Sequence, residues 1–465
     1  MAPPATLGDL RRSEYRVLPI KAELRRNLIR KLSAGEQLFA GIRGYDDTVI
    51  PQVVNAVLAG QDIVMLGERG QAKSRLIRSL TSLLDDALPV VAGCEINDNP
   101  YEPICRRCRD LIAADGDATQ IAWLEPAQRY SEKLATPDTS IADLIGEVDP
   151  IRVAEGRYLS DELTIHYGLI PRTNRGVFAI NELPDLAERI QVGLLNIIEE
   201  RDVQIRGYRL RLPLDVFVVA TANPEDYTNR GRIITPLKDR FGAQVRTHYP
   251  RTVDDEIAIA EQERTVFDDM PVPVLVPGFM KEIVAELSHV ARRHAQVNQR
   301  SGVSVRVSTA NYENLESNAL RRALTTGERE AVARISDLPA LMASTAGKIE
   351  LETWEDTDDS SVLEKLMKTA TNNVFRRHFT VQEFSDLVQR FDRGGFTVEV
   401  GDRLPGRAYR QALSELKGLD RARQKLDEPD SEAMRIAVLE FILEGLHLGK
   451  RLNKTSLDGS SVYGG

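Results

Sequence analysis

A glycine-containing loop that ends in lysine and serine is the first segment of this sequence that could do chemistry. It reads Gly67-Glu-Arg-Gly-Gln-Ala-Lys-Ser74, and it lies between an apolar stretch, Ile63–Leu66, and a helical pattern. This order is typical of a phosphate-binding loop. There the glycines let backbone N–H groups face the phosphates, Lys73 would reach the β- and γ-phosphates, and the Ser74 hydroxyl would bind Mg²⁺. A tight strand-to-helix turn that binds nothing is the alternative.

One position of the loop departs from the standard pattern. Ala72 stands where a second glycine is usual. Because alanine disfavours a positive φ angle, the sequence predicts that the loop takes a form that alanine tolerates, with Gly70 supplying the flexibility. The residues expected to contact a nucleotide here are Gly67, Glu68, Arg69, Gly70, Gln71, Ala72, Lys73, Ser74 and Arg75.

Two further apolar stretches end in polar side chains. Val177–Ile180 runs into Asn181 and Glu182, and Val216–Ala220 is followed shortly by Asn223. An acidic residue at such a strand end lies beside Mg²⁺ and the γ-phosphate in P-loop ATPases, so Glu182 is the candidate for orienting or activating the attacking water. Asn223 could hold the same water. The alternatives are a helix cap at Glu182 and an ordinary Asn-Pro turn at Asn223.

Asn181 is a candidate Mg²⁺ ligand together with Ser74, but it lacks the charge of the aspartate expected at its position. An amide keeps an oxygen acceptor and loses the negative charge that favours a metal site. We therefore expect either slow hydrolysis or a Mg²⁺ that depends more on Ser74 and the phosphates.

The elements that must position these residues alternate along the chain. Strand candidates are Ile63–Leu66, Leu88–Ala92, Val177–Ile180 and Val216–Ala220, with helical patterns such as Ser74–Leu84 and Asp185–Glu200 between them. This alternation predicts an α/β domain with a parallel sheet that is covered by helices on both faces. After residue 250 the strand pattern fades, and the rest of the chain is mostly helical. Its last helix is expected over Ser431–Leu448, with Ser431 as the N-cap.

The order of these motifs resembles that of the AAA+ ATPases of the MoxR and magnesium-chelatase I-subunit group, over roughly residues 36–345. The family's Gly-x-x-Gly-x-Ala-Lys-Ser/Thr loop matches residues 67–74, so Ala72 is itself a family trait. The segment that contains Asn181 and Glu182 resembles the family's Walker B region. Thr221-Ala-Asn223-Pro224 is similar to sensor 1.

The resemblance also implies roles for residues that no pattern would single out. Arg240, in Pro236–Phe241, is implied to be an arginine finger that reaches a neighbouring subunit's nucleotide, and Arg306 is implied to be the sensor 2 arginine of a lid helix. Ile42 and Tyr45 match a segment that packs on the adenine in relatives, with a core contact as the alternative. A surface or ion-pair arginine is the alternative for Arg240 and for Arg306.

By this resemblance the protein is expected to be an ATPase that uses ATP and Mg²⁺, assembles into a homo-oligomeric ring, in relatives a hexamer, and remodels or matures a partner protein. The implied partner carries a von Willebrand factor A domain. Alternatives are the motor subunit of a magnesium or cobalt chelatase, and a nucleotide-gated scaffold with weak hydrolysis, which Asn181 favours. A DNA-acting relative is less favoured, because neither end of the sequence shows a helix-turn-helix.

The expected architecture is a P-loop AAA+ parallel-sheet domain with a helical lid and a C-terminal helical accessory domain. The expected segments are a helical N-terminal segment over 1–35, the nucleotide domain over 36–250 with an insert over 93–176, the lid over 251–348, an acidic linker over 349–360, the C-terminal domain over 361–452 and a flexible tail over 453–465. Residues 146–157 and a hairpin-like piece at 203–212 resemble family insertions.

The three cysteines of the chain, Cys94, Cys105 and Cys108, form a separate pattern. A Cys-x-x-Cys pair with a third cysteine eleven positions earlier indicates Zn²⁺. A fourth ligand is then needed, for which His166 or an acidic side chain could serve. A redox thiol pair and buried free cysteines are the alternatives.

Composition sets the limits within which these motifs act. The 465 residues carry a net charge of −9, with 42% hydrophobic and 28% charged residues, which excludes wholesale disorder and a disulfide-stapled miniprotein. The acidic balance weighs against a protein that coats nucleic acid. No apolar stretch approaches the ~20 residues of a membrane helix, the N-terminus lacks a secretion signal, and a cytoplasmic location is expected.

Overall fold

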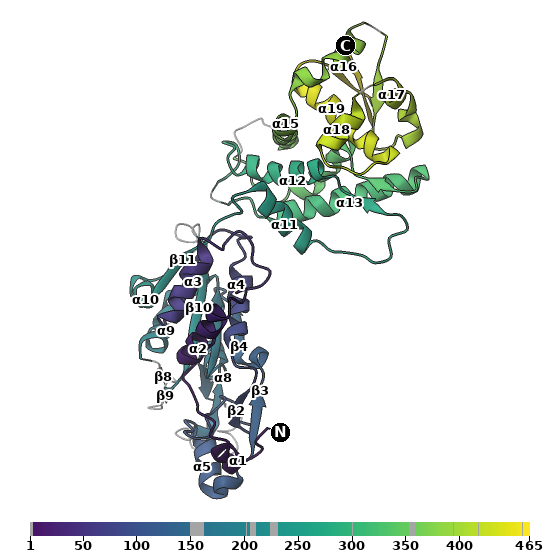
Figure 1. Ribbon diagram of the computed structural model, residues 1–465. Helices are drawn as coiled ribbons and strands as arrows, with labels where there is room; N and C mark the ends of the chain where they lie inside the picture. Colours follow the sequence, from purple (N-terminus) through teal and green to yellow (C-terminus); the bar gives the residue numbers. More distant parts are fainter. Residues whose placement is uncertain are drawn as a thin grey trace. The chain divides into compact units, whose positions relative to one another are not determined.

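The computed structural model describes residues 3–148, 162–200, 202–204, 211–223, 231–299, 301–352, 359–393, 395–416, 418–457 and 459–465. The chain forms two compact units, Met1–His248 and Tyr249–Gly465. Figure 1 shows the elements of both units. Among the described residues, two hydrophobic core clusters lie in the first unit and one in the second.

The first unit is built on a sheet of five parallel strands in the order β11-β1-β10-β7-β4. The strands are β1 (Ile63–Leu66), β4 (Tyr130–Leu134), β7 (Gly176–Asn181), β10 (Val216–Ala222) and β11 (Ala243–Arg246). Every residue of β1, β7 and β10 is buried, because strands covered on both faces must be apolar throughout. The predicted parallel sheet, with the glycine loop directly after its first strand, is confirmed.

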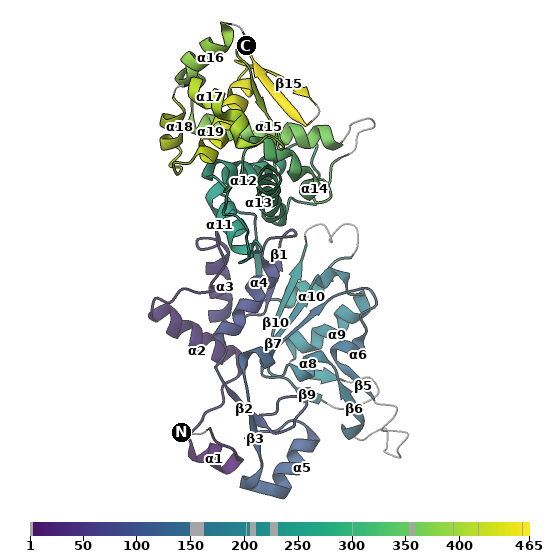
Figure 2. The ribbon, with the colours of Figure 1, turned by 90° about the vertical axis from the view of Figure 1, so that its right-hand side faces the viewer.

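Helices cover both faces of this sheet, as Figure 2 shows. Val177 and Ala179 share one core cluster with α2 (Ile20–Ser33), α3 (Val49–Leu58) and α4 (Lys73–Ser79). Their neighbours Phe178 and Ile180 belong to the opposite cluster, with α8 (Leu169–Arg172), α9 (Glu188–Glu199) and α10 (Thr235–Arg240). Successive side chains of a strand point to opposite faces, so one short apolar run supplies both cores.

One predicted strand lies elsewhere. Leu88–Ala92 was expected in the parallel sheet, but β2 (Leu88–Val91) pairs antiparallel with β3 (Ile121–Leu124) outside it. The place in the sheet belongs to β4, which sequence reasoning missed. Its residues Tyr-Ser-Glu-Lys-Leu are only partly buried, because it is an edge strand, and an edge strand does not read as a continuous apolar run.

The remaining described elements of the first unit are short. They are α1 (Leu7–Arg12), α5 (Arg106–Asp115), α6 (Ile141–Leu144), β5 (Gly146–Val148), β6 (Ile165–Tyr167), β8 (Asp202–Gln204) and β9 (Arg211–Pro213), with 3-10 turns at Leu80–Leu83, Gly116–Ala118, Pro126–Arg129, Glu162–Thr164 and Leu183–Asp185. β8 and β9 pair antiparallel, as the hairpin-like pattern at 203–212 predicts. Most of the predicted insertion at 146–157 lies outside the described residues.

The second unit is mainly helical. Its helices are α11 (Val253–Glu263), α12 (Gly278–Ala291), α13 (Arg306–Thr326), α14 (Met342–Thr345), α15 (Asp359–His378), α16 (Ser385–Asp392), α17 (Arg410–Glu415), α18 (Leu419–Lys425) and α19 (Glu432–Leu448), with 3-10 turns at Ile335–Leu341, Val381–Phe384 and Gly406–Tyr409. The predicted cap of the last helix is confirmed, since the Ser431 side chain accepts a hydrogen bond from the Met434 N–H at 3.1 Å.

Two expectations for this unit are wrong. The predicted lid and C-terminal domain are not separate bodies, because a single core cluster runs from Val276 to Tyr463. The predicted flexible tail forms β15 (Asn453–Leu457) and β16 (Ser460–Gly464), which join β14 (Val398–Val400) in an antiparallel sheet. Tyr463 is fully buried there. β15 and β16 pair with each other as a hairpin, with Leu457 opposite Ser460, and β16 also pairs with β14, some sixty residues away. The Asp-Gly pair at positions 458 and 459 is a hairpin signal that sequence reasoning missed. The other two strands, β12 (Val274–Leu275) and β13 (Ala331–Val332), pair in parallel.

Within the part of the chain that the structure describes, no helix combines the length and the hydropathy that crossing a membrane requires.

Candidate nucleotide-binding site

The glycine loop connects β1 to α4, and its backbone differs from our expectation. Ala72 has φ of 54° and ψ of 17°, so it adopts the left-handed conformation that the sequence predicted it would avoid. Gly70, at φ of 76°, is also in this region. A left-handed non-glycine residue costs roughly 1–2 kcal/mol, and the loop tolerates that cost because the adjacent strand and helix fix its ends.

Side chains from outside the loop hold it in place. The Tyr45 hydroxyl lies 2.8 Å from the carbonyl oxygens of both Gln71 and His248. The side-chain oxygen of Gln71 accepts hydrogen bonds from Thr247 Oγ1 at 2.7 Å and from the Glu68 N–H at 3.2 Å. A Cβ at position 67 would collide with the same two side-chain oxygens of Thr247 and Gln71, so Gly67 is required by close packing. Thr247 was missed by sequence reasoning, although a polar residue directly after β11 is a usable signal.

Of the two alternatives for Ile42 and Tyr45, the structure shows the core contact. Both side chains are about 95% buried in the cluster that α2, α3 and α4 share with the sheet. Burial raises the pKa of Tyr45 to about 12, so its hydroxyl stays protonated at neutral pH. A contact with adenine stays a prediction.

The residues expected to act on phosphates meet at the carboxyl ends of β1, β7 and β10. Lys73 is buried, and its Nζ donates hydrogen bonds to the carbonyl oxygens of Gly67 and Glu68 and to Asn223 Oδ1, the last at 2.7 Å. Asn223 Nδ2 in turn donates to Glu182 Oε2 at 2.8 Å. Three residues separated by up to 150 positions therefore form one continuous chain of hydrogen bonds.

Glu182 is held by its backbone rather than by a cap. It is left-handed, at φ of 56° and ψ of 49°, and its N–H donates to Thr221 Oγ1 at 2.9 Å. Its side chain makes no capping hydrogen bond to the turn that follows, which weighs against the helix-cap alternative. This backbone turn directs the carboxylate toward Asn223.

A carboxylate that sequence reasoning missed lies next to Asn181. The side-chain amide of Asn181 donates a hydrogen bond to Glu132 of the neighbouring strand β4. Glu132 also accepts two hydrogen bonds from the Arg78 guanidinium, at 2.8 and 3.0 Å, and one from the Tyr130 hydroxyl at 2.9 Å. Burial alone would raise the pKa of Glu132, but these donors lower it below its ordinary value.

The oxygen atoms available near the loop fit a magnesium ion. Ser74 is the second residue of α4 and is partly buried. Asn181 Oδ1 has a single long contact with Thr221 Oγ1, at 3.4 Å. Hydroxyl and amide oxygens are ligands that Mg²⁺ accepts when phosphates supply the rest of its shell. Ser74 and Asn181 thus remain the candidate protein ligands.

A cavity of about 310 Å³ opens beside the loop. It is lined by Leu66, Gly67, Glu68, Gln71, Lys238, Arg246 and Thr247. This volume is at the low end for small-molecule sites, and the two cationic side chains suit an anionic ligand. Sequence reasoning identified the loop residues of this lining but neither Lys238 nor Arg246.

The two candidate arginines lie at the periphery of their units. Arg240 forms an ion pair with Glu199, at the end of α9, and donates to the Pro236 carbonyl oxygen at 2.9 Å. Arg306 is the exposed first residue of α13, in the second unit. A role in another subunit's site, or in a site shared by two units, stays a prediction for both. Arg69 and Arg75 are exposed on the loop and on α4.

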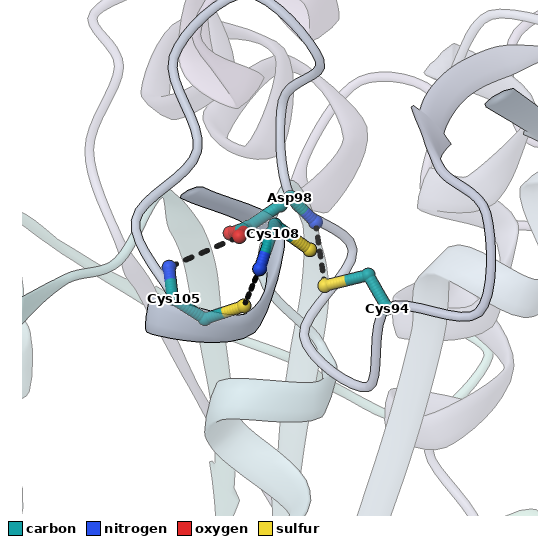
Figure 3. Close-up of side chains that lie close together, drawn as sticks. All are labelled: Cys94, Asp98, Cys105 and Cys108. Atoms are coloured by element: carbon teal, nitrogen blue, oxygen red, sulfur yellow. Dashed lines mark hydrogen bonds between the residues drawn. The ribbon is translucent and has the colours of Figure 1, made fainter. Parts of the chain in front are cut away.

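The cysteines form a second site in the same unit. The ligand atoms of Cys94, Asp98, Cys105 and Cys108 all lie within 4.8 Å of one another (Figure 3). His166, named as a possible fourth ligand, is exposed in β6 and is not part of this group. The acidic alternative is the one that the structure provides, as Asp98.

A five-stranded parallel sheet in this order, with a phosphate loop after β1 and polar side chains at the ends of β7 and β10, defines the AAA+ class of P-loop folds. Sequence comparison names a narrower group. The chain is 26% identical over 240 residues to the magnesium-chelatase subunit ChlI of Synechocystis sp., a match that covers 50% of this chain and 63% of that protein. It is 27% identical over 240 residues to the magnesium-chelatase 38 kDa subunit of Rhodobacter capsulatus, covering 49% and 60%.

These matches confirm the resemblance to magnesium-chelatase I subunits, and the chain spans less than two thirds of the length of these two relatives. Among solved structures, a model of the complex between subunits BchI and BchD of magnesium chelatase matches with a TM-score of 0.36 and 20% identity, over 70% of this chain and 98% of that one. A TM-score this low carries no argument of its own. No family model matches the sequence.

Proposed function

We propose that this protein is an AAA+ ATPase that binds ATP with Mg²⁺ at the loop 67–74 and hydrolyses it to remodel or mature a partner protein. The observation that carries the proposal is the hydrogen-bonded chain from Lys73 through Asn223 to Glu182. It joins the cation that would hold phosphates to the acid that would act on water. The chain satisfies the buried Lys73 and Asn223 side chains without a ligand, and it places the cation and the acid where one ligand could contact both.

Each member of the chain has a role that its geometry supports. Lys73 exchanges its contacts with the loop carbonyl oxygens and Asn223 for the β- and γ-phosphates. Asn223 is then free to orient the attacking water, and the Glu182 carboxylate accepts a hydrogen bond or a proton from that water. Ser74 and Asn181 would hold Mg²⁺, which neutralises charge on the phosphates when it is bound.

We also propose that the active form is a ring, a hexamer by analogy with the family, in which Arg240 of one subunit completes the site of the next. The Arg240 side chain is partly exposed and pairs with the exposed Glu199. This is compatible with the role, because breaking a surface ion pair costs only about 0–1 kcal/mol. Arg306 would contact the nucleotide from the lid. The cytoplasmic location expected from the sequence is part of the same proposal.

The partner is the least constrained part of the function. A protein with a von Willebrand factor A domain is our first candidate, on the family resemblance. The similarity to magnesium-chelatase subunits supports a chelatase motor as the alternative. A scaffold that binds ATP but hydrolyses it weakly is the third candidate, and the neutral Asn181 beside Glu132 favours it.

The test separates binding from turnover. Glu182→Gln should bind ATP with the affinity of the unmodified protein and lose about 10²-fold or more in turnover, whereas Lys73→Ala should lose binding. Glu188→Gln, an exposed acid on the helix that follows, is the matched control and should change neither quantity. Calorimetry with ATP and a phosphate-release assay measure the two.

The outcomes distinguish the candidates. Tight binding without turnover in the unmodified protein supports the scaffold. Absence of nucleotide binding overturns the whole proposal. Proteins captured with a non-hydrolysable ATP analogue would identify the partner, and metal insertion into a tetrapyrrole by the reconstituted subunits would establish the chelatase alternative.

A further inference from the structure

Four side chains with metal-binding chemistry meet in the segment between β2 and β3. They are Cys94, Asp98, Cys105 and Cys108, whose ligand atoms lie within 4.8 Å of one another (Figure 3). Asp98, Cys105 and Cys108 are buried, and Cys94 is partly buried. In the described ranges of the chain this is the one such group of His, Cys, Asp or Glu side chains.

The strongest sign of a missing partner is on Asp98. This side chain is completely buried, yet its Oδ1 atom has no hydrogen-bond partner. The other oxygen, Oδ2, accepts a hydrogen bond from the Cys105 N–H at 3.0 Å. A buried carboxylate oxygen without a partner is costly, and none of the three neighbouring thiols satisfies it. A cation bound among the sulfur atoms would.

Backbone N–H groups donate hydrogen bonds to two of the sulfur atoms. Cys105 is the N-cap of α5, and its Sγ accepts a hydrogen bond from the Cys108 N–H at 3.3 Å. Cys94 Sγ accepts one from the Asp98 N–H at 3.4 Å. These backbone contacts hold two of the sulfur atoms within the group, whose ligand atoms all lie within 4.8 Å of one another.

The helix that contains Cys108 and is capped by Cys105 has a small buried face. Of the ten residues of α5, Cys108 is the only one that is fully buried, and Leu111 and Ile112 pack partly against the core. Most helices in proteins depend on a buried apolar face for their stability, and the face of α5 is limited to these residues. A metal that joins Cys105 and Cys108 to Cys94 and Asp98 would fasten the helix to the loop that precedes it.

We propose that Cys94, Asp98, Cys105 and Cys108 bind one structural Zn²⁺. Three thiolates and one carboxylate complete a tetrahedral shell with no open position, which is the pattern of a structural rather than a catalytic zinc site. Tetrahedral Zn–S bonds of about 2.3 Å place sulfur atoms ~3.8 Å apart. Because the ligand atoms already lie within 4.8 Å of one another, small side-chain rotations that move them by about 1 Å would complete the site. Soft sulfur ligands exclude Mg²⁺ and Ca²⁺.

The surrounding charge fits this assignment. Four anionic ligands around Zn²⁺ leave a net charge of about −2. Arg106, Arg107 and Arg109 stand beside the cysteines in the sequence, and the Arg107 guanidinium lies next to Gly93 at the start of the loop. Arg106 and Arg109 also form ion pairs with Asp110 and Glu162, so these cations offset only part of the negative charge of the site.

The test measures metal in the purified full-length protein without added zinc. We expect about one zinc per chain by elemental analysis, released in step with the appearance of three reactive thiols when a chelator is added. Cys108→Ser and Asp98→Asn should each retain far less zinc. Asp98→Asn keeps an oxygen that can accept from the Cys105 N–H, so it removes the charge with little change in shape. Asp110→Asn, an exposed acid on α5, is the matched control and should retain zinc fully.

A readout on the unmodified protein covers the case in which a variant does not fold. Cobalt(II) exchanged into the site should show thiolate-to-cobalt charge-transfer bands and the visible spectrum of a tetrahedral ion. Three thiols that react freely without chelator, a Cys105–Cys108 disulfide, or iron in place of zinc would each overturn the assignment. None of these measurements depends on ATP binding or turnover, so the result is independent of the proposed ATPase function.

Discussion

The side-chain amide of Asn181, at the end of β7, donates a hydrogen bond to the carboxylate of Glu132 on the adjacent strand β4. An aspartate at position 181 would instead place two carboxylates in contact. The neutral residue at position 181, where the family pattern implies an aspartate, therefore complements the carboxylate of Glu132. The negative charge that the sequence lacks at position 181 is present in the fold, on the next strand.

The variant Asn181→Asp tests this match. We expect it to lower the stability of the first unit by about 1–2 kcal/mol at neutral pH, because like charges in contact repel and raise one carboxyl pKa. A carboxyl group whose pKa is raised in the folded state destabilises the folded protein at high pH. The stability lost in the variant should therefore be partly regained as the pH falls and one carboxyl is protonated. Thermal unfolding measured from about pH 4 to about pH 8 reports this change in stability.

The double variant Asn181→Asp with Glu132→Gln is the control, because it restores one amide and one carboxylate in exchanged positions. It should recover most of the lost stability. If the single variant is as stable as the unmodified protein at neutral pH, the inference that Asn181 complements the charge of Glu132 is wrong. The Mg²⁺ dependence of ATP turnover in both variants also tests whether the charge at position 181 limits hydrolysis.

The left-handed Ala72 makes a second prediction. Glycine has no Cβ penalty at φ of 54°, so Ala72→Gly should stabilise the nucleotide-free protein by about 0.5–1 kcal/mol, the relief of strain exceeding the entropy lost to the more flexible unfolded chain. Thermal unfolding without nucleotide is the measurement. Ala59→Gly, at an exposed alanine with φ of −83°, should bring no gain; equal effects of both changes would disprove the strain argument.

Mixed rings test whether Arg240 acts in a neighbouring subunit. Arg240→Ala should reduce turnover by roughly 10³-fold, as arginine fingers do, while leaving nucleotide binding intact. Lys73→Ala should be inactive because its own site cannot hold ATP. A mixture of the two should regain activity, since Arg240 of the Lys73→Ala subunit can serve the intact site beside it. Glu199→Gln removes the ion-pair partner of Arg240 and should not lower the rate.

No recovery in the mixture, with ring assembly verified by light scattering, would mean that Arg240 serves its own subunit or only the structure. Activity that is independent of protein concentration down to the monomer would lead to the same conclusion.

The second unit contains a buried carboxylate whose stability contribution depends on pH. Glu256 is fully buried; Arg292 donates to it at 2.6 and 2.9 Å, Ser308 donates at 2.7 Å, and the His289 ring is 3.6 Å away. Burial would raise the pKa of Glu256, but these partners hold it below the ordinary value of 4.5. Its stabilisation is thus complete above about pH 4.5 and is lost as the pH falls toward the lower folded-state pKa.

Glu256→Gln should therefore destabilise the unit by about 3 kcal/mol at neutral pH, because it leaves Arg292 buried without its counter-ion. The difference from the unmodified protein should narrow in acid. Hydrogen exchange of α11 and α13 reports this unit alone. Glu261 lies on α11 with Glu256 and forms an ion pair with Lys281 of α12, so Glu261→Gln should change exchange little. A loss of stability at Glu256→Gln that does not depend on pH would contradict the linkage.

Local patterns were enough to predict which residues meet at the candidate nucleotide site. The loop from Gly67 to Ser74, the acid at Glu182 and the amide at Asn223 each follow an apolar strand, and the carboxyl ends of parallel strands meet at one edge of a sheet. Sequence could not predict β4, because an edge strand has no continuous apolar run, nor the pairing of β16 with β14, because β14 lies far away along the chain.

The sequence by itself determined which residues could do chemistry and that they follow consecutive buried strands, since backbone period and turn chemistry are local properties. Only the tertiary structure decided which side chains face one another: Lys73 with Asn223, Asn181 with Glu132, and Asp98 with the three cysteines. The physical reason is that hydrogen bonds and metal shells form between atoms a few ångströms apart in space, and those neighbours are set by strand order and register rather than by spacing along the chain.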